Sequence, residues 1–152
     1  MSASTRPHGA IAVPLRWRDL DHLGHVYHGT LLTLLDEARV TFLGDAIGFD
    51  RPDAYVVVHL EIDYVDELRR DAEQVLVTFS VERVGNTSIT TREVVTVPDG
   101  TVVARTTVTS VQWDPLTHKP LPLSARQRDR GRGLASADVE DTVDSETTGA
   151  DT

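Results

Sequence analysis

The chain has 152 residues, of which 39% are hydrophobic and 26% charged, a balance typical of one globular domain with a buried core. It contains no cysteine, which excludes disulfides, thiolate metal sites and a cysteine nucleophile. The net charge is -9, but residues 133–152 hold six acidic residues and no basic one, so the rest of the chain carries only -3. No basic patch is interleaved with aromatic residues, so nothing indicates a nucleic-acid partner.

No stretch approaches the ~20 apolar residues of a membrane span, and residues 1–15 lack the apolar centre of a signal peptide. We therefore expect a cytoplasmic protein with no membrane partner. A single domain is predicted over residues 10–125. Residues 1–9 are expected to be disordered, and so is the tail 126–152, which begins with a short basic cluster and continues as an acidic segment.

The domain begins with a predicted strand over residues 10–19. Its apolar residues alternate and are expected to share one face: Ile11, Val13, Leu15 and Trp17. A leucine-rich helix is predicted over residues 30–43, because its apolar residues recur at helical spacing. Gly44 and Gly48 follow and are expected to end this helix.

The remainder of the domain is predicted to be four strands, at residues 54–65, 72–84, 87–97 and 101–114. Gly-Asn at 85–86 and Pro-Asp-Gly at 98–100 predict tight turns that join neighbouring strands. The order predicts an α+β fold, in which an antiparallel five-stranded sheet wraps around one long central helix. One helix cannot cover such a sheet, so we expect a homo-oligomer formed through an edge strand.

The segment before the predicted helix, DLDHLGHVYHGT, carries the candidate chemistry. His22, His25 and His28 recur at intervals of three close to Asp21, and such groups can bind a metal ion. However, Gly24 and the helix start interrupt the segment, so it is not one continuous helix, and no HExxH pattern is present. We therefore expect no metal site and interpret the carboxylate, not the histidines, as the reactive group.

The longer stretch RDLDHLGHVYHGTLLTLLDEAR resembles the signature of hotdog-fold acyl-CoA thioesterases of the 4-hydroxybenzoyl-CoA thioesterase type. The shared pattern is an aspartate, a glycine three residues on, and a hydrophobic–aromatic pair that leads into the helix: Asp21, Gly24, Val26 and Tyr27. VVVHLEIDYVDEL and VERVGNTSIT also resemble later strands of that family, so the similarity covers residues 10–123. The resemblance implies a catalytic carboxylate at Asp21 and an oxyanion-binding backbone N–H at His28 or Gly29.

Five residues are candidate substrate contacts: Tyr27, Glu37, His59, Thr87 and Ser88. Four of them, all except Tyr27, have a plain structural alternative. Glu37 either hydrogen-bonds near the site or pairs with a base, and His59 lies on the strand that the resembled family uses at its dimer interface. Thr87 and Ser88 are ordinary strand residues. Two departures from the family pattern are Leu31, where an aromatic residue is frequent, and Glu67, where a proline is common.

The chemistry is consistent with this resemblance. A helix start presents unpaired N–H groups that can polarise a carbonyl, and Asp21 precedes it by seven residues. Asp21 could attack a thioester directly or deprotonate a water molecule, and the sequence leaves both open. We expect hydrolysis of an acyl-CoA by a homodimer or homotetramer, with no cofactor because CoA is part of the substrate.

Three alternatives are a thioesterase acting on acyl-carrier-protein thioesters, a non-catalytic module that binds acyl thioesters, and a hotdog dehydratase. Dehydratases of that fold commonly carry Asp-x4-His, and the residue five after Asp21 is Val26, so this spacing fails. A purely binding module needs no carboxylate beside the carbonyl, so Asp21 disfavours the second alternative. The acyl group itself is not predictable from the sequence.

Overall fold

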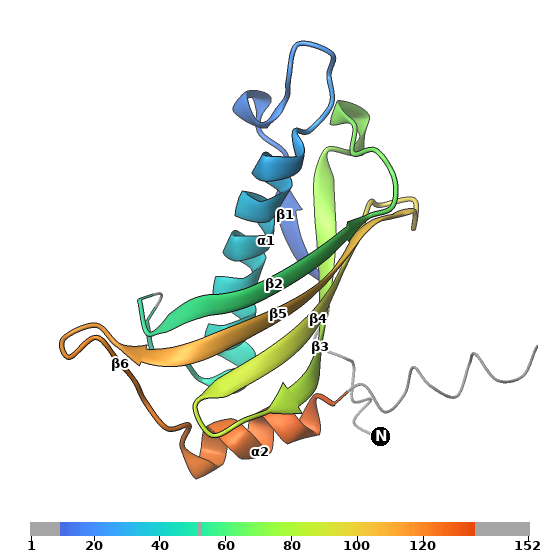
Figure 1. Cartoon of the computed structure of the whole chain (residues 1–152). Helices are drawn as coiled ribbons and strands as arrows, with labels where there is room; N and C mark the ends of the chain where they lie inside the picture. Colours follow the sequence, from blue (N-terminus) through green and yellow to red (C-terminus); the bar gives the residue numbers. More distant parts are fainter. Residues whose placement is uncertain (1–9, 52, 136–152) are drawn as a thin grey trace, which may run out of the picture.

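The computed structural model describes residues 10–51 and 53–135, which form a curled antiparallel sheet around one long helix (Figure 1). The strand order in the sheet is β1-β3-β4-β5-β2, and the two-residue strand β6 pairs with β5 outside this path. The strand bounds are β1 Ile11–Pro14, β2 Tyr55–Tyr64, β3 Gln74–Val84, β4 Ser88–Thr96, β5 Val102–Asp114 and β6 Lys119–Pro120. The predicted α+β fold, with five antiparallel strands and one central helix, is confirmed.

The central helix, α1, spans His28–Phe42 and continues as a π-helical turn, η2, over Leu43–Ile47. It therefore begins two residues before the predicted start and passes through Gly44, which was expected to end it. Gly48 ends it instead: its backbone has φ of 98°, and its N–H donates to the carbonyl of Leu43 at 2.9 Å. A left-handed residue at this position favours glycine, which explains why the second glycine and not the first is the stop signal.

The core lies between α1 and the concave face of the sheet. Alternate residues of β3 are buried from Val75 to Val81, as expected for a strand with one face against a core. Leu34, Leu35 and Phe42 of α1 are also buried, and the ring of Phe42 stacks on Phe79 with centroids 4.5 Å apart. This packing fixes the helix against the sheet and so fixes the position of its N-terminus.

The first strand is shorter than predicted. Val13 is buried, but Trp17 is 81% exposed, so the prediction that the two share one face of the strand is wrong. The strand ends at Pro14, and a 3-10 turn, η1, follows at Trp17–Asp19. The N–H of Arg16 donates to Oδ2 of Asp19 at 2.7 Å, and this bond turns the chain before the alternation can continue.

The C-terminal boundary also differs from the prediction, because residues 125–133 form a helix, α2, and are not disordered. Ser124 caps its first turn through reciprocal hydrogen bonds with Gln127. Gly131 is buried, since a Cβ there would lie 2.9 Å from Val84; the missing side chain lets α2 approach the sheet. The predictions for residues 1–9 and 136–152 fall outside the described residues.

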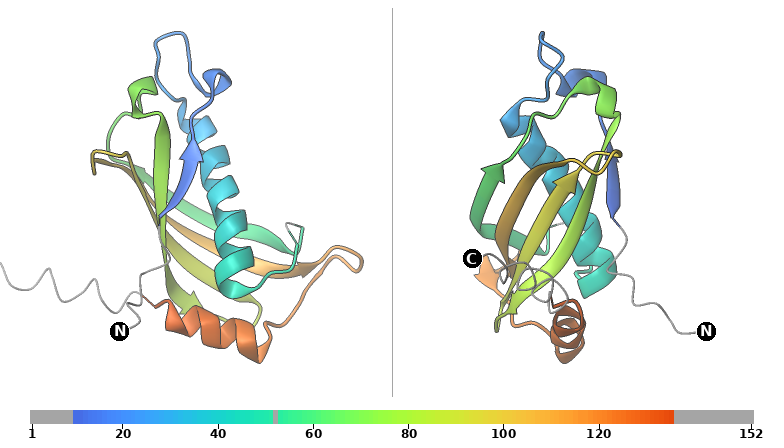
Figure 2. Two further views of the ribbon diagram at one scale, coloured as in Figure 1. Left: turned by 180° about the vertical axis from the view of Figure 1, so that it is seen from behind. Right: turned by 90° about the vertical axis from the view of Figure 1, so that its right-hand side faces the viewer.

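The two ends of the molecule are distinct. Figures 1 and 2 show α2 across one end of the sheet, while the start of α1, η1 and the 3-10 turn η3 (Arg70–Ala72) gather at the other. No helix in the described part of the chain is long and apolar enough to cross a membrane. The predicted reactive segment lies at the end of the molecule where α1 begins.

Candidate active site

A tight turn holds Asp21 in place before α1. Its Oδ1 atom accepts hydrogen bonds from the backbone N–H groups of Leu23, at 2.9 Å, and His25, at 3.0 Å. The Asp21 N–H in turn donates to the His25 carbonyl at 2.8 Å. Gly24 completes the turn with φ of 78°, a conformation that favours glycine. Within the described residues, Oδ2 of Asp21 accepts no hydrogen bond, so one carboxylate oxygen is left free.

The same contacts set the charge of this carboxyl. The hydrogen bond from the His25 N–H has the largest effect and lowers the pKa of Asp21 below its ordinary value of 3.8. Desolvation opposes this shift, and the hydrogen bond from the Leu23 N–H adds to the lowering. The nearby histidines His25 and His22 lower the pKa further. Asp21 is therefore ionised at neutral pH, as both nucleophilic attack and general-base catalysis require.

The N-terminus of α1 supplies unpaired donors. The first main-chain bond of the helix runs from the Leu31 N–H to the Tyr27 carbonyl at 3.2 Å. The N–H groups of His28, Gly29 and Thr30 precede it and have no partner within the helix. Tyr27 caps the helix only through its backbone, because its side chain accepts no capping bond. A Cβ on Gly29 would lie 2.7 Å from the Tyr27 ring, so glycine lets that ring lie against the first turn.

Asp21 and the start of α1 line one open groove of about 570 Å³. The lining residues are Asp21, His25, Val26, Tyr27, His28, Leu31, Tyr64, Asp66, Glu67 and Leu68. The structure therefore brings together three of the predicted site residues, Asp21, Tyr27 and His28, and Gly29 follows directly in the helix. A carbonyl placed in this groove could meet a free carboxylate oxygen and helix N–H groups.

The other predicted contacts do not line this groove. Glu37 is half-buried on α1 and pairs with Arg16 at 3.4 Å, which is the structural alternative considered above. The His59 ring lies 3.1 Å from the Glu61 carboxylate on the exposed edge strand β2. Ser88 begins β4 and Thr87 precedes it in the β3–β4 turn, away from the start of α1 (Figure 1).

The three histidines near Asp21 take separate structural roles. His22 is exposed in the turn, His25 forms a β-bridge with Arg69, and His28 is the first residue of α1. The His25 ring lies 3.9 Å from the Glu67 carboxylate. Among the residues that the structure describes, no group of three or more histidines and carboxylates is arranged to hold a metal ion.

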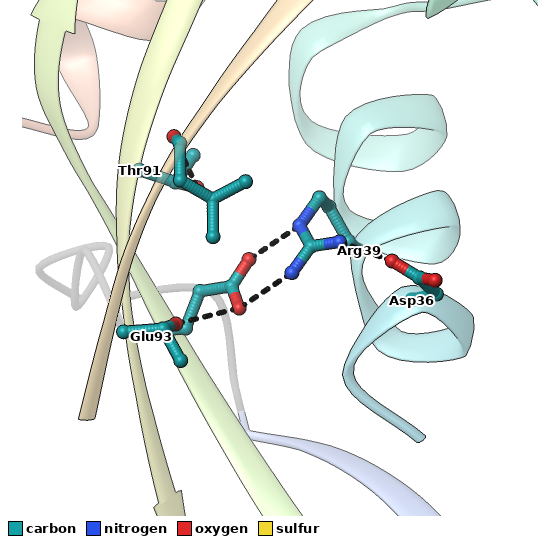
Figure 3. A network of polar contacts seen from close by, with 6 residues as sticks. Asp36, Arg39, Thr91 and Glu93 are labelled. Atoms are coloured by element: carbon teal, nitrogen blue, oxygen red, sulfur yellow. Dashed lines mark hydrogen bonds and ion pairs between the residues drawn. The ribbon is translucent and has the colours of Figure 1, made fainter. Parts of the chain in front are cut away.

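Sequence reasoning missed a buried ion pair between α1 and the sheet (Figure 3). Arg39 and Glu93 are both fully buried, and the guanidinium binds both carboxylate oxygens, with Nε–Oε1 at 2.6 Å and a second contact to Oε2 at 2.9 Å. Thr106 also donates to Oε2 at 2.8 Å, and Asp36 accepts from Arg39 at 2.5 Å. Asp36 is thus a second acidic partner of Arg39 and lies on the same helix. A carboxylate on the inward face of a predicted strand was the signal for this network.

A second missed residue is Tyr64, at the end of β2. Its hydroxyl donates to the His28 carbonyl at 3.2 Å, and its ring meets the His28 ring edge-on with centroids 5.9 Å apart. On the other side, the His28 ring lies 4.1 Å from the Tyr27 ring. Three aromatic rings therefore surround the first turn of α1. The signal in the sequence was an aromatic residue at the end of a strand whose inner face points toward the helix.

Comparison with known proteins identifies the family. The family model described as "Thioesterase superfamily" matches residues 23–104, more than half of the chain. The matched segment begins after Asp21 and includes Gly24, α1 and the strands β2, β3 and β4. The chain belongs to the thioesterase superfamily. A comparison with curated protein sequences found no match.

Solved structures agree with the membership of this superfamily. A thioesterase from Thermus thermophilus, complexed with coenzyme A and Zn, is 27% identical, with a TM-score of 0.69 over 83% of this chain and 92% of that one. A predicted thioesterase from Bacillus stearothermophilus is 25% identical, with a TM-score of 0.71 over 83% and 95%. A 1,4-dihydroxy-2-naphthoyl-CoA thioesterase from Synechocystis, 16% identical with a TM-score of 0.66 over 83% and 96%, shares the fold. Family and fold together indicate thioester hydrolysis in general terms.

Proposed function

We propose that this protein hydrolyses an acyl-CoA thioester to the free acid and CoA, with Asp21 as the reactive carboxylate. The observation that carries the proposal is that Asp21 and the N-terminus of α1 line one groove, with a carboxylate oxygen free of hydrogen bonds within the described residues. The Thermus thermophilus relative complexed with coenzyme A supports a CoA ester as the substrate.

In the proposed reaction, the thioester carbonyl lies at the start of α1. The free oxygen of Asp21 either attacks the carbonyl carbon, giving a mixed anhydride that water then hydrolyses, or removes a proton from a water molecule that attacks it. In both routes the carbonyl oxygen becomes negative and the CoA thiolate leaves. The N–H groups of His28 and Gly29, together with the positive end of the helix, stabilise that negative charge.

A metal ion or other bound cofactor has no part in this proposal. The proposed assembly is a homodimer or homotetramer. β2 supports it, because among the described strands it pairs only with β5 and leaves one edge open, with Val57 and Val58 exposed. The acyl group would then lie along α1 at the boundary between subunits. In such an assembly, His59 would be a contact between subunits.

The test is release of thiol from a panel of aromatic, short-chain and medium-chain acyl-CoAs by the wild type and by Asp21→Asn. Asparagine keeps the side-chain oxygen that accepts the Leu23 and His25 N–H bonds and removes the negative charge. We expect kcat for the best substrate to fall by a factor of ~10²–10⁴, the usual contribution of a positioned acid or base. The fold is expected to be unchanged by circular dichroism.

Asp19→Asn is the matched control, because Asp19 lies two residues away, bonds to the Arg16 N–H and does not line the groove. It should keep wild-type activity. Equal activity of Asp21→Asn and the wild type would refute the assignment of Asp21. A wild type that is inert on every CoA ester but cleaves a carrier-bound thioester would show the carrier-protein alternative, and inertness on both would favour a binding module.

A further inference from the structure

Tyr64 reaches the first turn of α1 from the far side of the groove. It is the last residue of β2, and its hydroxyl donates to the carbonyl oxygen of His28 at 3.2 Å. Burial raises the pKa of the Tyr64 hydroxyl above its ordinary value of 10.0, so it keeps its proton and remains a donor at neutral pH. The contact joins two residues that are 36 positions apart in the chain.

The carbonyl that Tyr64 binds belongs to a particular peptide group. The C=O of His28 and the N–H of Gly29 are the two ends of one planar, trans amide, so they point in opposite directions. A hydrogen bond to the oxygen fixes the plane of this amide and thereby the direction of the Gly29 N–H. It also polarises the amide, which makes the N–H a stronger donor. Gly29 is one of the N–H groups that have no partner within the helix.

The strand that carries Tyr64 is itself anchored. Tyr64 pairs with Ala104 in the register of β2 with β5, and the next residue, Val65, donates its N–H to the Val103 carbonyl at 2.9 Å. The hydroxyl is therefore presented from the sheet. By contrast, the helix start has no side-chain cap of its own. The sheet supplies through Tyr64 a polar constraint that the residues before α1 do not provide.

We propose that Tyr64 is a positioning residue, which orients and polarises the His28–Gly29 peptide group so that the Gly29 N–H binds the developing oxyanion. This inference rests on the proposed thioester hydrolysis. Tyr64 does not exchange protons with the substrate. It acts through the amide, and the residue, which is 48% exposed, lines the groove.

The first experiment compares Tyr64→Phe with the wild type on the best substrate of the acyl-CoA panel. Phenylalanine keeps the ring and removes only the hydroxyl. Loss of one ordinary hydrogen bond corresponds to a fall of about 2- to 13-fold, which we expect in kcat with KM unchanged. Tyr55→Phe is the matched control, because Tyr55 starts the same strand, lies beside Phe49 and does not line the groove. It should leave both constants at wild-type values.

A second measurement tests the contact without turnover. Because the Tyr64 hydroxyl binds the carbonyl of the amide that contains the Gly29 nitrogen, Tyr64→Phe should shift the NMR resonance of that nitrogen, and Tyr55→Phe should not. An unchanged Gly29 resonance, or a change in KM alone, would mean that Tyr64 only lines the groove, and the proposal would be wrong. If the wild type cleaves no thioester, the proposed function fails, and the Gly29 resonance still decides whether Tyr64 positions this amide.

Discussion

Two carboxylates, Asp21 in the turn before α1 and Glu93 on β4, are held in very different ways. Glu93 is fully buried and binds Arg39 and Thr106 through both of its oxygens. Asp21 is exposed, and backbone N–H groups fix one of its oxygens while the other accepts no hydrogen bond within the described residues. A carboxylate that is buried and has both oxygens in hydrogen bonds stabilises the fold. A carboxylate that is held firmly and keeps one oxygen free can react.

The largest expected effect tests the structural half of this comparison. Glu93→Leu leaves the Arg39 guanidinium buried without its main partner, and breaking a buried pair in this way costs about 3–5 kcal/mol. We expect the free energy of unfolding to fall by that amount, measured by urea denaturation. Asp21→Asn should leave the unfolding midpoint close to that of the wild type, because the asparagine oxygen can still accept the two backbone bonds.

The double variant Arg39→Met, Glu93→Leu separates two contributions to stability: the loss of the ion pair itself, and the cost of leaving the Arg39 charge buried without a partner. Replacing a buried ion pair with apolar side chains is often neutral for stability. We therefore expect the double variant to regain most of the stability that Glu93→Leu loses. If Glu93→Leu alone unfolds at the wild-type urea concentration, the buried pair does not have the structural role described here.

A smaller effect is expected from glycine substitutions, which distinguish the positioning of Asp21 by its turn from the stability of the whole protein. Gly24 and Gly100 both have positive φ, of 78° and 94°, and a Cβ on either would meet nothing within 4 Å. Alanine at each position should therefore cost the same ~1–2 kcal/mol of backbone strain. Only Gly24→Ala should reduce activity, by up to ~10²-fold in kcat/KM, because it displaces Asp21. Equal activity in the two variants would show that the turn does not position the carboxylate.

The smallest expected effect is in the dependence on pH. The pKa of Asp21 is lowered, so the carboxylate stays charged until the pH falls below its ordinary value of 3.8. The activity should therefore show no acid limb from Asp21 between about pH 5 and about pH 8, measured as kcat/KM on one acyl-CoA. A fall in activity below about pH 6.5 would instead indicate a histidine, because the usual pKa of an imidazole lies at that pH.

Much of the fold was predictable, because periodicity and turn residues act locally. The alternation around Val77 and Val81 indicated β3, and the leucine spacing indicated α1. Trp17 was misplaced because the hydrogen bond from the Arg16 N–H to Asp19 ends the alternation, and this bond depends on side-chain chemistry that a hydrophobic pattern does not contain. The helix α2 was missed because its sequence is strongly polar and Gly131 is its one buried residue. Hydrogen bonds from Gln127 to Gln112 and from Arg128 to Asn86 attach it to distant parts of the chain.

The candidate site was predictable to a different extent. Asp21, His28 and Gly29 are close in the sequence, so a turn followed by a helix start places them near one another. Tyr64 binds His28, 36 positions away in the sequence, and Glu93 binds Arg39, 54 positions away. Local sequence patterns do not reveal contacts between residues so far apart. Glu93 did give a signal in the sequence, because it is the one charged residue on the inner side of β4 between Ile89 and Val95. The substrate contacts proposed at Thr87 and Ser88 stay predictions.

The turn that holds Asp21 is also hydrogen-bonded to the segment that follows β2. The Val26 N–H donates to the Leu68 carbonyl at 2.9 Å, and the Arg70 N–H donates to the Gly24 carbonyl at 3.1 Å. The conformational entropy of this segment is therefore lost when the chain folds and not when a ligand arrives. Binding energy from the substrate need not be used to order the loop and remains available for the transition state.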